Sequence, residues 1–159
     1  MLPGFATLPL DAPMPAMPDD ALERALRGSG YVHIAGVDEV GRGCLAGPVV
    51  AAAAILPVGW TYKGLTDSKQ MTEDARTAAE ETLKAETVWA IGMCSPAEID
   101  RWNILRASLE AMNRAIKGLK QQPDFLLVDG NQALPAAACR QQTVIKGDAR
   151  SLSIAAASV

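Results

Sequence analysis

The sequence predicts a mixed α/β domain built around a single β-sheet. Five apolar segments of strand length are bounded by turn residues, and two segments with helical periodicity lie between them. The chain has 159 residues, of which 49% are hydrophobic and 21% are charged, a balance typical of one globular domain with its own core. No internal repeat is visible in the sequence.

The first 30 residues are predicted to form a proline-rich tail followed by a short helix. Five prolines within the first 18 residues favour an extended, mobile chain. The sequence "DDALERALRG" (residues 19–28) then favours a short helix that ends at its glycine. We therefore place the main domain at residues 31–159.

The predicted strands differ in how clearly the sequence marks them. The first, residues 31–39, follows the turn sequence "GSG". The second, residues 47–56, is bounded by Pro48 and Pro57, which favour a strand, although its alanines would also allow a helix. The remaining predicted strands are residues 87–94, 125–131 and 142–148.

Two long helices and the start of a third are predicted. In residues 71–86, Thr72 is the expected N-cap. The next helix begins with the capping box from Ser95 to Glu98 and is expected to continue to Leu119. Residues 149–159 begin the last helix. One apolar stripe of the 95–119 helix is predicted to face the core: Ile99, Trp102, Leu105, Leu109, Met112, Ile116 and Leu119.

Composition excludes several classes of protein. The formal net charge of −3 argues against general polyanion binding through a positive field, so contact with nucleic acid requires a local patch. The three cysteines are scattered and the only histidine, His33, cannot complete a zinc site with them. Reduced cysteines, no membrane-length apolar run and no signal-peptide pattern favour a cytoplasmic protein without a membrane partner.

Acidic residues end three of the five predicted strands, at Asp38 and Glu39, at Asp129 and at Asp148. Each acid alone is more typical of a turn or a helix cap than of a metal site. Together at one sheet edge they would repel one another, and a hard cation such as Mg²⁺ would relieve that repulsion. The four carboxylates are therefore candidate metal ligands.

The adjacent acids Asp38 and Glu39 impose a constraint. Neighbouring side chains of a regular strand point to opposite faces of the sheet, so both can serve one site only if the strand bends or ends there. Gly41 and Gly43 would allow such a break.

Five ordered motifs resemble type 2 ribonucleases H, the bacterial ribonuclease HII group. They are "GVDEVGRGCLAGPVVAAAAIL", "LTDSKQMTEDAR", "SPAEIDRWNILRASLEAM", "LVDGN" and "VIKGDARSLSIAAAS". The resemblance covers residues 31–159. It implies the ribonuclease H fold, a mixed five-stranded sheet flanked by helices. It also implies two-metal hydrolysis of RNA in RNA–DNA hybrids, and nicking 5′ of ribonucleotides in duplex DNA, which leaves a 3′-hydroxyl and a 5′-phosphate.

The resemblance also assigns roles to residues. The catalytic metal ligands for Mg²⁺ or Mn²⁺ would be Asp38, Glu39, Asp129 and Asp148, and the substrate contacts would be Gly41, Arg42, Gly43 and Lys69. Glycine backbone can approach a ribose closely, and an arginine can reach a phosphate. Without the resemblance, "GRG" would indicate a turn. Lys146 and Arg150 are further candidates for phosphate contacts, whereas His33 is expected to be a packing residue.

Family members continue past the position of Val159 with an "AKV" segment, an "RD" pair and further helices. The resemblance therefore implies a domain that is incomplete at its C-terminus. We expect the chain to be a monomer. A fragment that binds hybrids without cleaving them is one alternative. A metal-dependent phosphatase for small nucleotides is another, but it would have no need for the "GRG" and "DSK" segments.

Overall fold

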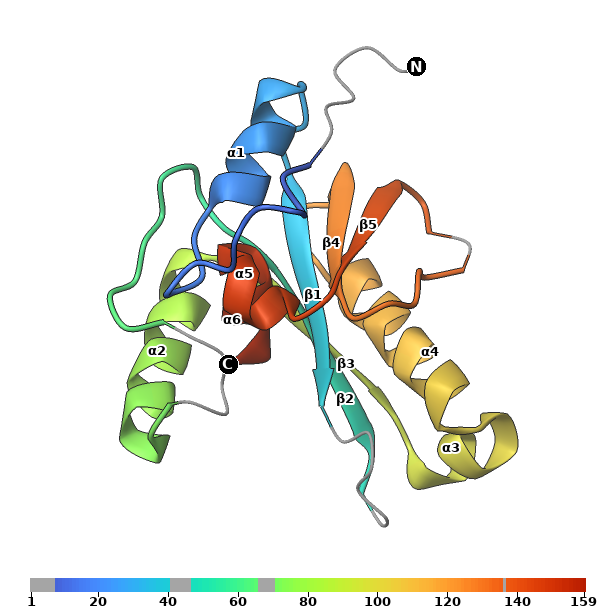
Figure 1. Cartoon of the computed structure of the whole chain (residues 1–159). Coiled ribbons are helices and arrows are strands. Elements are labelled where there is room, and N and C mark those ends of the chain that lie inside the picture. Colours follow the sequence, from blue (N-terminus) through green and yellow to red (C-terminus); the bar gives the residue numbers. More distant parts are fainter. Residues whose placement is uncertain (1–7, 41–46, 66–70, 136) are drawn as a thin grey trace.

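The computed structural model describes residues 8–40, 47–65, 71–135 and 137–159, which form one mixed sheet with helices on both faces (Figure 1). The five predicted strands are confirmed, with the spatial order β3-β2-β1-β4-β5. Their bounds are β1 Ile34–Val40, β2 Val49–Ile55, β3 Val88–Cys94, β4 Phe125–Asp129 and β5 Arg140–Val144. The alanine-rich segment of residues 47–56 is therefore a strand and not a helix.

Strand β1 lies at the centre of the sheet. It pairs with β2 in antiparallel fashion, and β2 pairs with β3 in the same way. On its other side β1 runs parallel to β4, and β4 runs parallel to β5. Because β1 and β4 run in the same direction, their carboxyl ends meet at one edge of the sheet.

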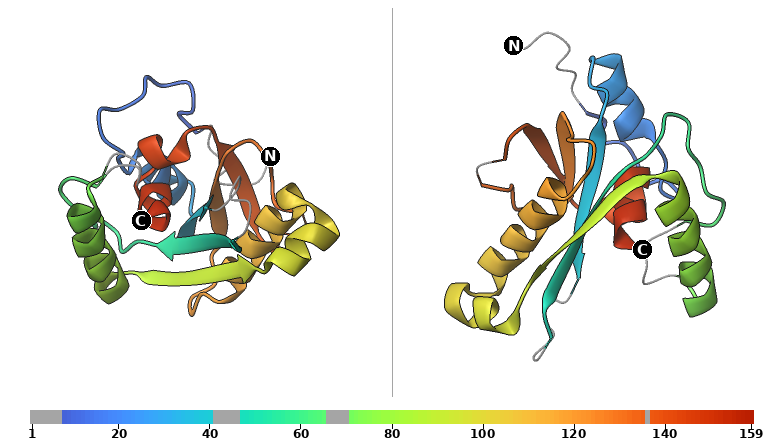
Figure 2. Two further views of the ribbon diagram at one scale, coloured as in Figure 1. Left: turned by 90° about the horizontal axis from the view of Figure 1, so that it is seen from below. Right: turned by 180° about the vertical axis from the view of Figure 1, so that it is seen from behind.

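Helices cover both faces of the sheet (Figure 2). One face packs against α3 (Pro96–Trp102) and α4 (Ile104–Lys117). The other face packs against α1, α2 and α6, with the one-turn helix α5 beside them. The bounds of these four helices are α1 Ala21–Gly28, α2 Glu73–Glu86, α5 Gly147–Arg150 and α6 Leu152–Ser158. No helix among the described residues is long and apolar enough to cross a membrane.

The prediction of one continuous helix over residues 95–119 is wrong, because the chain breaks at Asn103. This residue has φ 87° and ψ 165°, a conformation that cannot continue a helix. Its backbone N–H donates to the Ile99 carbonyl and ends α3. Its side chain accepts from the Arg106 N–H at 3.0 Å and begins α4. The capping box at Ser95 is confirmed.

The buried face of α4 is made of small side chains and differs from the predicted stripe. Of that stripe only Met112 and Leu119 are buried, whereas alanines of α4 are fully buried against the sheet. The helix lies so close to β3 that a methyl group on Gly92 would collide with the carbonyl oxygen of Ala111. Large side chains at the centre of this face would push the helix away, so they flank it instead.

The N-terminal segment from residue 8 contacts the C-terminal part of the chain. The Arg150 guanidinium donates to the carbonyls of Pro9, at 3.2 Å, and of Ala12, at 2.9 Å. The predicted short helix is confirmed as α1, and its Leu22 and Leu26 are buried against the sheet. Helix α1 is therefore part of the core, whereas residues 11–14 before it are exposed.

Candidate active site

Asp38 lies in the central strand β1 and is only 8% exposed. Strand alternation places it on the same face as Ile34 and Gly36, the face covered by α6. Its Oδ1 accepts the Glu39 N–H at 2.8 Å. Burial beside a hydrogen-bonded sheet makes this carboxylate costly to ionise unless a positive charge is near.

Asp129 is the last residue of β4 and comes beside Asp38 through strand pairing. Val37 of β1 is in register with Val128 of β4, so the residue after each lies at the shared edge of the sheet. The Asp129 Oδ1 accepts the Gly147 N–H at 2.7 Å. The prediction that the ends of these two strands bring their acids together is confirmed.

Asp148 reaches the same edge by a different route from the predicted one. Strand β5 ends at Val144, and Asp148 lies in α5 after Lys146, which has φ 53°. A side chain at Gly147 would meet Ile154 Cδ1 at 2.5 Å and Asp129 Oδ1 at 3.1 Å. Glycine therefore leaves room for the close approach of this turn to Asp129 and Ile154, and it is this tight turn that brings Asp148 to the cluster.

Asp38, Asp129 and Asp148 form a carboxylate cluster. Each offers one oxygen atom, and these oxygens all lie within 4.8 Å of one another. Burial, then the charge and hydrogen bonding of Asp129, and to a smaller extent the charge of Asp148, raise the pKa of Asp38 to about 9. The three acids cannot all carry their charge cheaply at neutral pH without a compensating cation.

The carboxylate cluster fits a hard divalent cation. It offers only oxygen ligands, which suit Mg²⁺ or Mn²⁺, from three separate elements of the fold. The pKa of Asp38 is raised first by burial and then by the neighbouring acids, and a cation bound beside them would offset both effects.

Glu39 does not belong to the carboxylate cluster. The expected break in the strand at Glu39 is not found, since pairing with β2 stays regular through Glu39↔Ala51 and Val40↔Val50. Regular alternation directs the Glu39 side chain to the face opposite Asp38. Glu39 and Asp38 nevertheless both line one cavity, together with Ala52, Ile91 and the end of α6.

The other predicted site residues have different outcomes. Gly41, Arg42, Gly43 and Lys69 lie outside the described residues. Lys146 is exposed next to the turn that carries Asp148. The guanidinium of Arg150 is engaged by the tail carbonyls described above and is not directed to a phosphate track. His33 is half-buried before β1, and its N–H donates to Asp124 at 2.9 Å.

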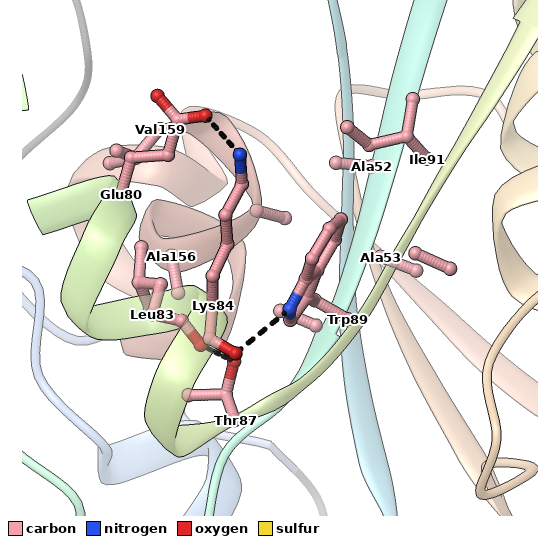
Figure 3. A pocket seen from close by; sticks show the side chains of 13 residues that line it. Ala52, Ala53, Glu80, Leu83, Lys84, Thr87, Trp89, Ile91, Ala156 and Val159 are labelled. Carbon is pink, nitrogen blue, oxygen red and sulfur yellow. Dashed lines mark hydrogen bonds and ion pairs between the residues drawn. The ribbon is translucent and has the colours of Figure 1, made fainter. Parts of the chain in front are cut away.

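A second cavity lies between α2, α6 and the sheet, and Figure 3 shows it to be of another kind. Alanines, Leu83 and Trp89 make up much of its wall. Its charged side chains, Lys84 and Glu80, pair with each other at 2.8 Å. This cavity contains none of the predicted site residues.

One buried acidic residue near the candidate site was not predicted from the sequence. Glu23 of α1 is 2% exposed, and its Oε2 accepts from the hydroxyls of Ser151 and Ser153. The sequence did contain a signal for this burial. Glu23 lies beside Leu22 and three residues before Leu26, on the apolar face of the helix, and an acid on that face is expected to be buried.

Comparisons with known proteins agree with this geometry. The ribonuclease HII family model matches residues 35–159. Ribonuclease HII of Paracoccus denitrificans is 55% identical over 142 residues, which cover 89% of this chain and 68% of that protein. Ribonuclease HII of Ruegeria sp. (strain TM1040) is 52% identical over 142 residues, covering 89% of this chain and 62% of that protein.

The fold matches solved structures as well. Ribonuclease H2 from Pyrococcus horikoshii is 26% identical and superposes with a TM-score of 0.69, covering 80% of this chain and 69% of that one. The chain spans between 61% and 70% of the length of four curated relatives that it matches. The carboxylate cluster, the ribonuclease H fold and the family match together place this chain in the ribonuclease HII family.

Proposed function

We propose that this chain is a metal-dependent endonuclease that hydrolyses the RNA strand of RNA–DNA hybrids and nicks 5′ of ribonucleotides embedded in duplex DNA. The products would be a 3′-hydroxyl and a 5′-phosphate. The observation that carries this proposal is the carboxylate cluster at the edge of the sheet, in a chain of the ribonuclease HII family.

Asp38, Asp129 and Asp148 would hold Mg²⁺ or Mn²⁺ in a two-metal arrangement. When bound, such cations activate water and stabilise the leaving oxygen of a phosphodiester. Asp38 must lose its proton to become a ligand, because its pKa without metal is about 9. The Gly147 N–H fixes the orientation of the Asp129 carboxylate through its bond to Oδ1. We propose Glu39 as a further ligand, because it lines the same cavity as Asp38, although its carboxylate would have to change conformation to join the other three acids.

Recognition of the ribose is proposed for Gly41, Arg42 and Gly43. They follow β1 directly and so lie near Asp38 along the chain. The 2′-hydroxyl both donates and accepts hydrogen bonds, so exposed backbone groups can distinguish a ribonucleotide from its deoxy neighbours. Lys69 and the exposed Lys146 are proposed phosphate contacts.

Cleavage of a labelled DNA duplex with one embedded ribonucleotide tests the proposed function. In Mg²⁺ or Mn²⁺ we expect a single nick on the 5′ side of the ribonucleotide, and no cleavage in EDTA or of an all-DNA duplex. Asp38→Asn, Asp129→Asn and Asp148→Asn should each abolish cleavage. Asp100→Asn, which changes an exposed acid of α3, is the matched control and should cleave like the wild type.

Other outcomes would favour the alternatives. Tight binding of the hybrid without cleavage in either metal would indicate a binding fragment, and cleavage restored by a longer chain would support that reading. Equal hydrolysis of a free nucleotide would indicate a phosphatase. Unchanged cleavage by Asp38→Asn would refute the assigned site.

We also propose that the protein acts as a monomer in the cytoplasm. Among the described residues Cys94 and Cys139 are free thiols, as expected in a reducing compartment. Light scattering of the purified chain tests the oligomeric state, and fractionation of cells tests the location.

A further inference from the structure

We propose that Glu23 is a positioning residue for the carboxylate cluster. From α1 it fixes the junction of α5 and α6, and through that junction it holds Asp129 and Asp148 where they can share a divalent cation. This inference rests on the proposed function, because it names a residue outside the cluster on which metal binding depends.

The contacts of Glu23 converge on one short segment. Its Oε2 accepts from Ser151 Oγ at 2.6 Å, from Ser153 Oγ at 2.6 Å and from the Ser153 N–H at 2.8 Å. Glu23 is 2% exposed and both serines are fully buried. Hydrogen bonds to a buried carboxylate are strong and costly to lose, so these three bonds fix the segment firmly.

The segment held by Glu23 leads directly to the cluster. The Ser151 N–H donates to the Gly147 carbonyl at 2.7 Å and closes the single turn of α5. The Gly147 N–H in turn donates to Asp129 Oδ1 at 2.7 Å, and Asp148 is the next residue in that turn. Hydrogen bonds through Ser151 and Gly147 thus link Glu23 to Asp129. Asp148 belongs to the same turn, so its position depends on the same bonds.

A second contact ties the same junction to β1. The start of α6 lies so close to the sheet that a methyl group on Gly36 would collide with the backbone of Ser153. Gly36 is two residues before Asp38 in the same strand. By fixing Ser153, Glu23 therefore sets the separation between the turn that bears Asp148 and the strand that bears Asp38.

The carboxylate of Glu23 bonds only with Ser151 and Ser153 among the described residues. Among the described residues no group donates to Glu23 Oε1, so its bonds are all directed to Ser151 and Ser153. A side chain needed only to fill space in α1 would be apolar, as its neighbours Leu22 and Leu26 are.

The test compares Glu23→Ala, Glu23→Gln and Leu26→Ala in the whole chain. Leu26 is a matched control, because it lies on the same helix and is also 2% exposed, but it packs only in the apolar cluster. Binding of Mn²⁺ is measured by electron paramagnetic resonance below the unfolding transition of every variant. Amide exchange at Gly147 and Ser151 is measured in the metal-free proteins.

We expect Glu23→Ala to weaken Mn²⁺ binding about tenfold, as is typical when a residue that orients metal ligands is removed. It should also speed amide exchange at Gly147 and Ser151. Leu26→Ala should lower thermal stability but leave Mn²⁺ affinity and exchange at these two amides unchanged. Glu23→Gln keeps an acceptor for the serines, so its affinity should lie between those of Glu23→Ala and the wild type.

Two results would overturn the inference while leaving the proposed function intact. One is a wild-type Mn²⁺ affinity in Glu23→Ala. The other is an equal loss of affinity in Glu23→Ala and Leu26→Ala, which would show that Glu23 acts through stability alone. If the wild type itself neither binds Mn²⁺ nor cleaves its substrate, the proposed function fails and the inference fails with it.

Discussion

The buried carboxylate of Asp38 should make the metal-free protein less stable as the pH rises, and Asp38→Asn should remove this loss. The pKa of Asp38 is about 9 in the folded chain, against an ordinary value of 3.8. Between these values the folded state keeps a proton that the unfolded chain has released. The folded state therefore binds more protons, and the free energy of unfolding falls with rising pH.

The size of the effect follows from the width of this window. Each pH unit inside it lowers the free energy of unfolding by about 1.4 kcal/mol. From about pH 5 to about pH 8 the loss is therefore at most about 4 kcal/mol, a large part of the stability of an ordinary domain. An asparagine carries no charge at either pH, so the variant should show no such slope from this position.

Urea unfolding in EDTA, followed by circular dichroism, measures the free energy of unfolding of the wild type and of Asp38→Asn at each pH. Asp38→Asn should become more stable than the wild type as the pH rises, whereas Asp100→Asn should track the wild type. Adding Mn²⁺ at about pH 8 should stabilise the wild type and not Asp38→Asn. Parallel curves for wild type and Asp38→Asn would refute the account of burial and repulsion at this site.

Three further predictions concern the scaffold. Gly36→Ala should destabilise the fold by about 3 kcal/mol and weaken Mn²⁺ binding, because its methyl group would push α6 away from β1; Gly28→Ala, with open space around it, should do neither in the same urea and Mn²⁺ titrations. Asn103→Ala should be less stable than Asn103→Gly by about 1 kcal/mol in urea unfolding, because only glycine adopts φ 87° and ψ 165° without strain. Glu98→Gln should lower the melting temperature at neutral pH, since bonding to Arg114 holds the pKa of Glu98 at about 2. The stabilisation by the ionised Glu98 is present above the ordinary pKa of a glutamate and disappears as the pH falls through about 2. The melting temperatures of the wild type and Glu98→Gln should therefore converge in acid.

Helix-capping residues and strand patterns were enough to predict most of the secondary structure from the sequence. Thr72 caps α2 and Ser95 caps α3, as their local sequences predict. The break at Asn103 escaped prediction because the apolar periodicity continues across it, while the break itself depends on one backbone conformation. The buried alanines of α4 escaped for a related reason, since periodicity does not reveal how closely a helix approaches a sheet.

The position of Asp148 shows a limit of the same kind. The sequence placed it at the end of a strand, and the structure places it in a one-turn helix after a left-handed residue. Both routes lead to the same edge of the sheet. The sequence therefore predicted that Asp148 lies near Asp38 and Asp129, but not that a one-turn helix places it there.

The five strands, the candidate acids and the resemblance to the ribonuclease HII group could all be predicted from the amino-acid sequence, because each rests on short-range patterns of residues. The convergence of Asp38, Asp129 and Asp148 without Glu39 became visible in the folded chain, since it depends on strand register and the alternation of side chains. The contact of Glu23 with Ser151 and Ser153 joins residues far apart in the chain. No local pattern encodes such a contact, because it arises only when the two ends of the chain pack against one sheet.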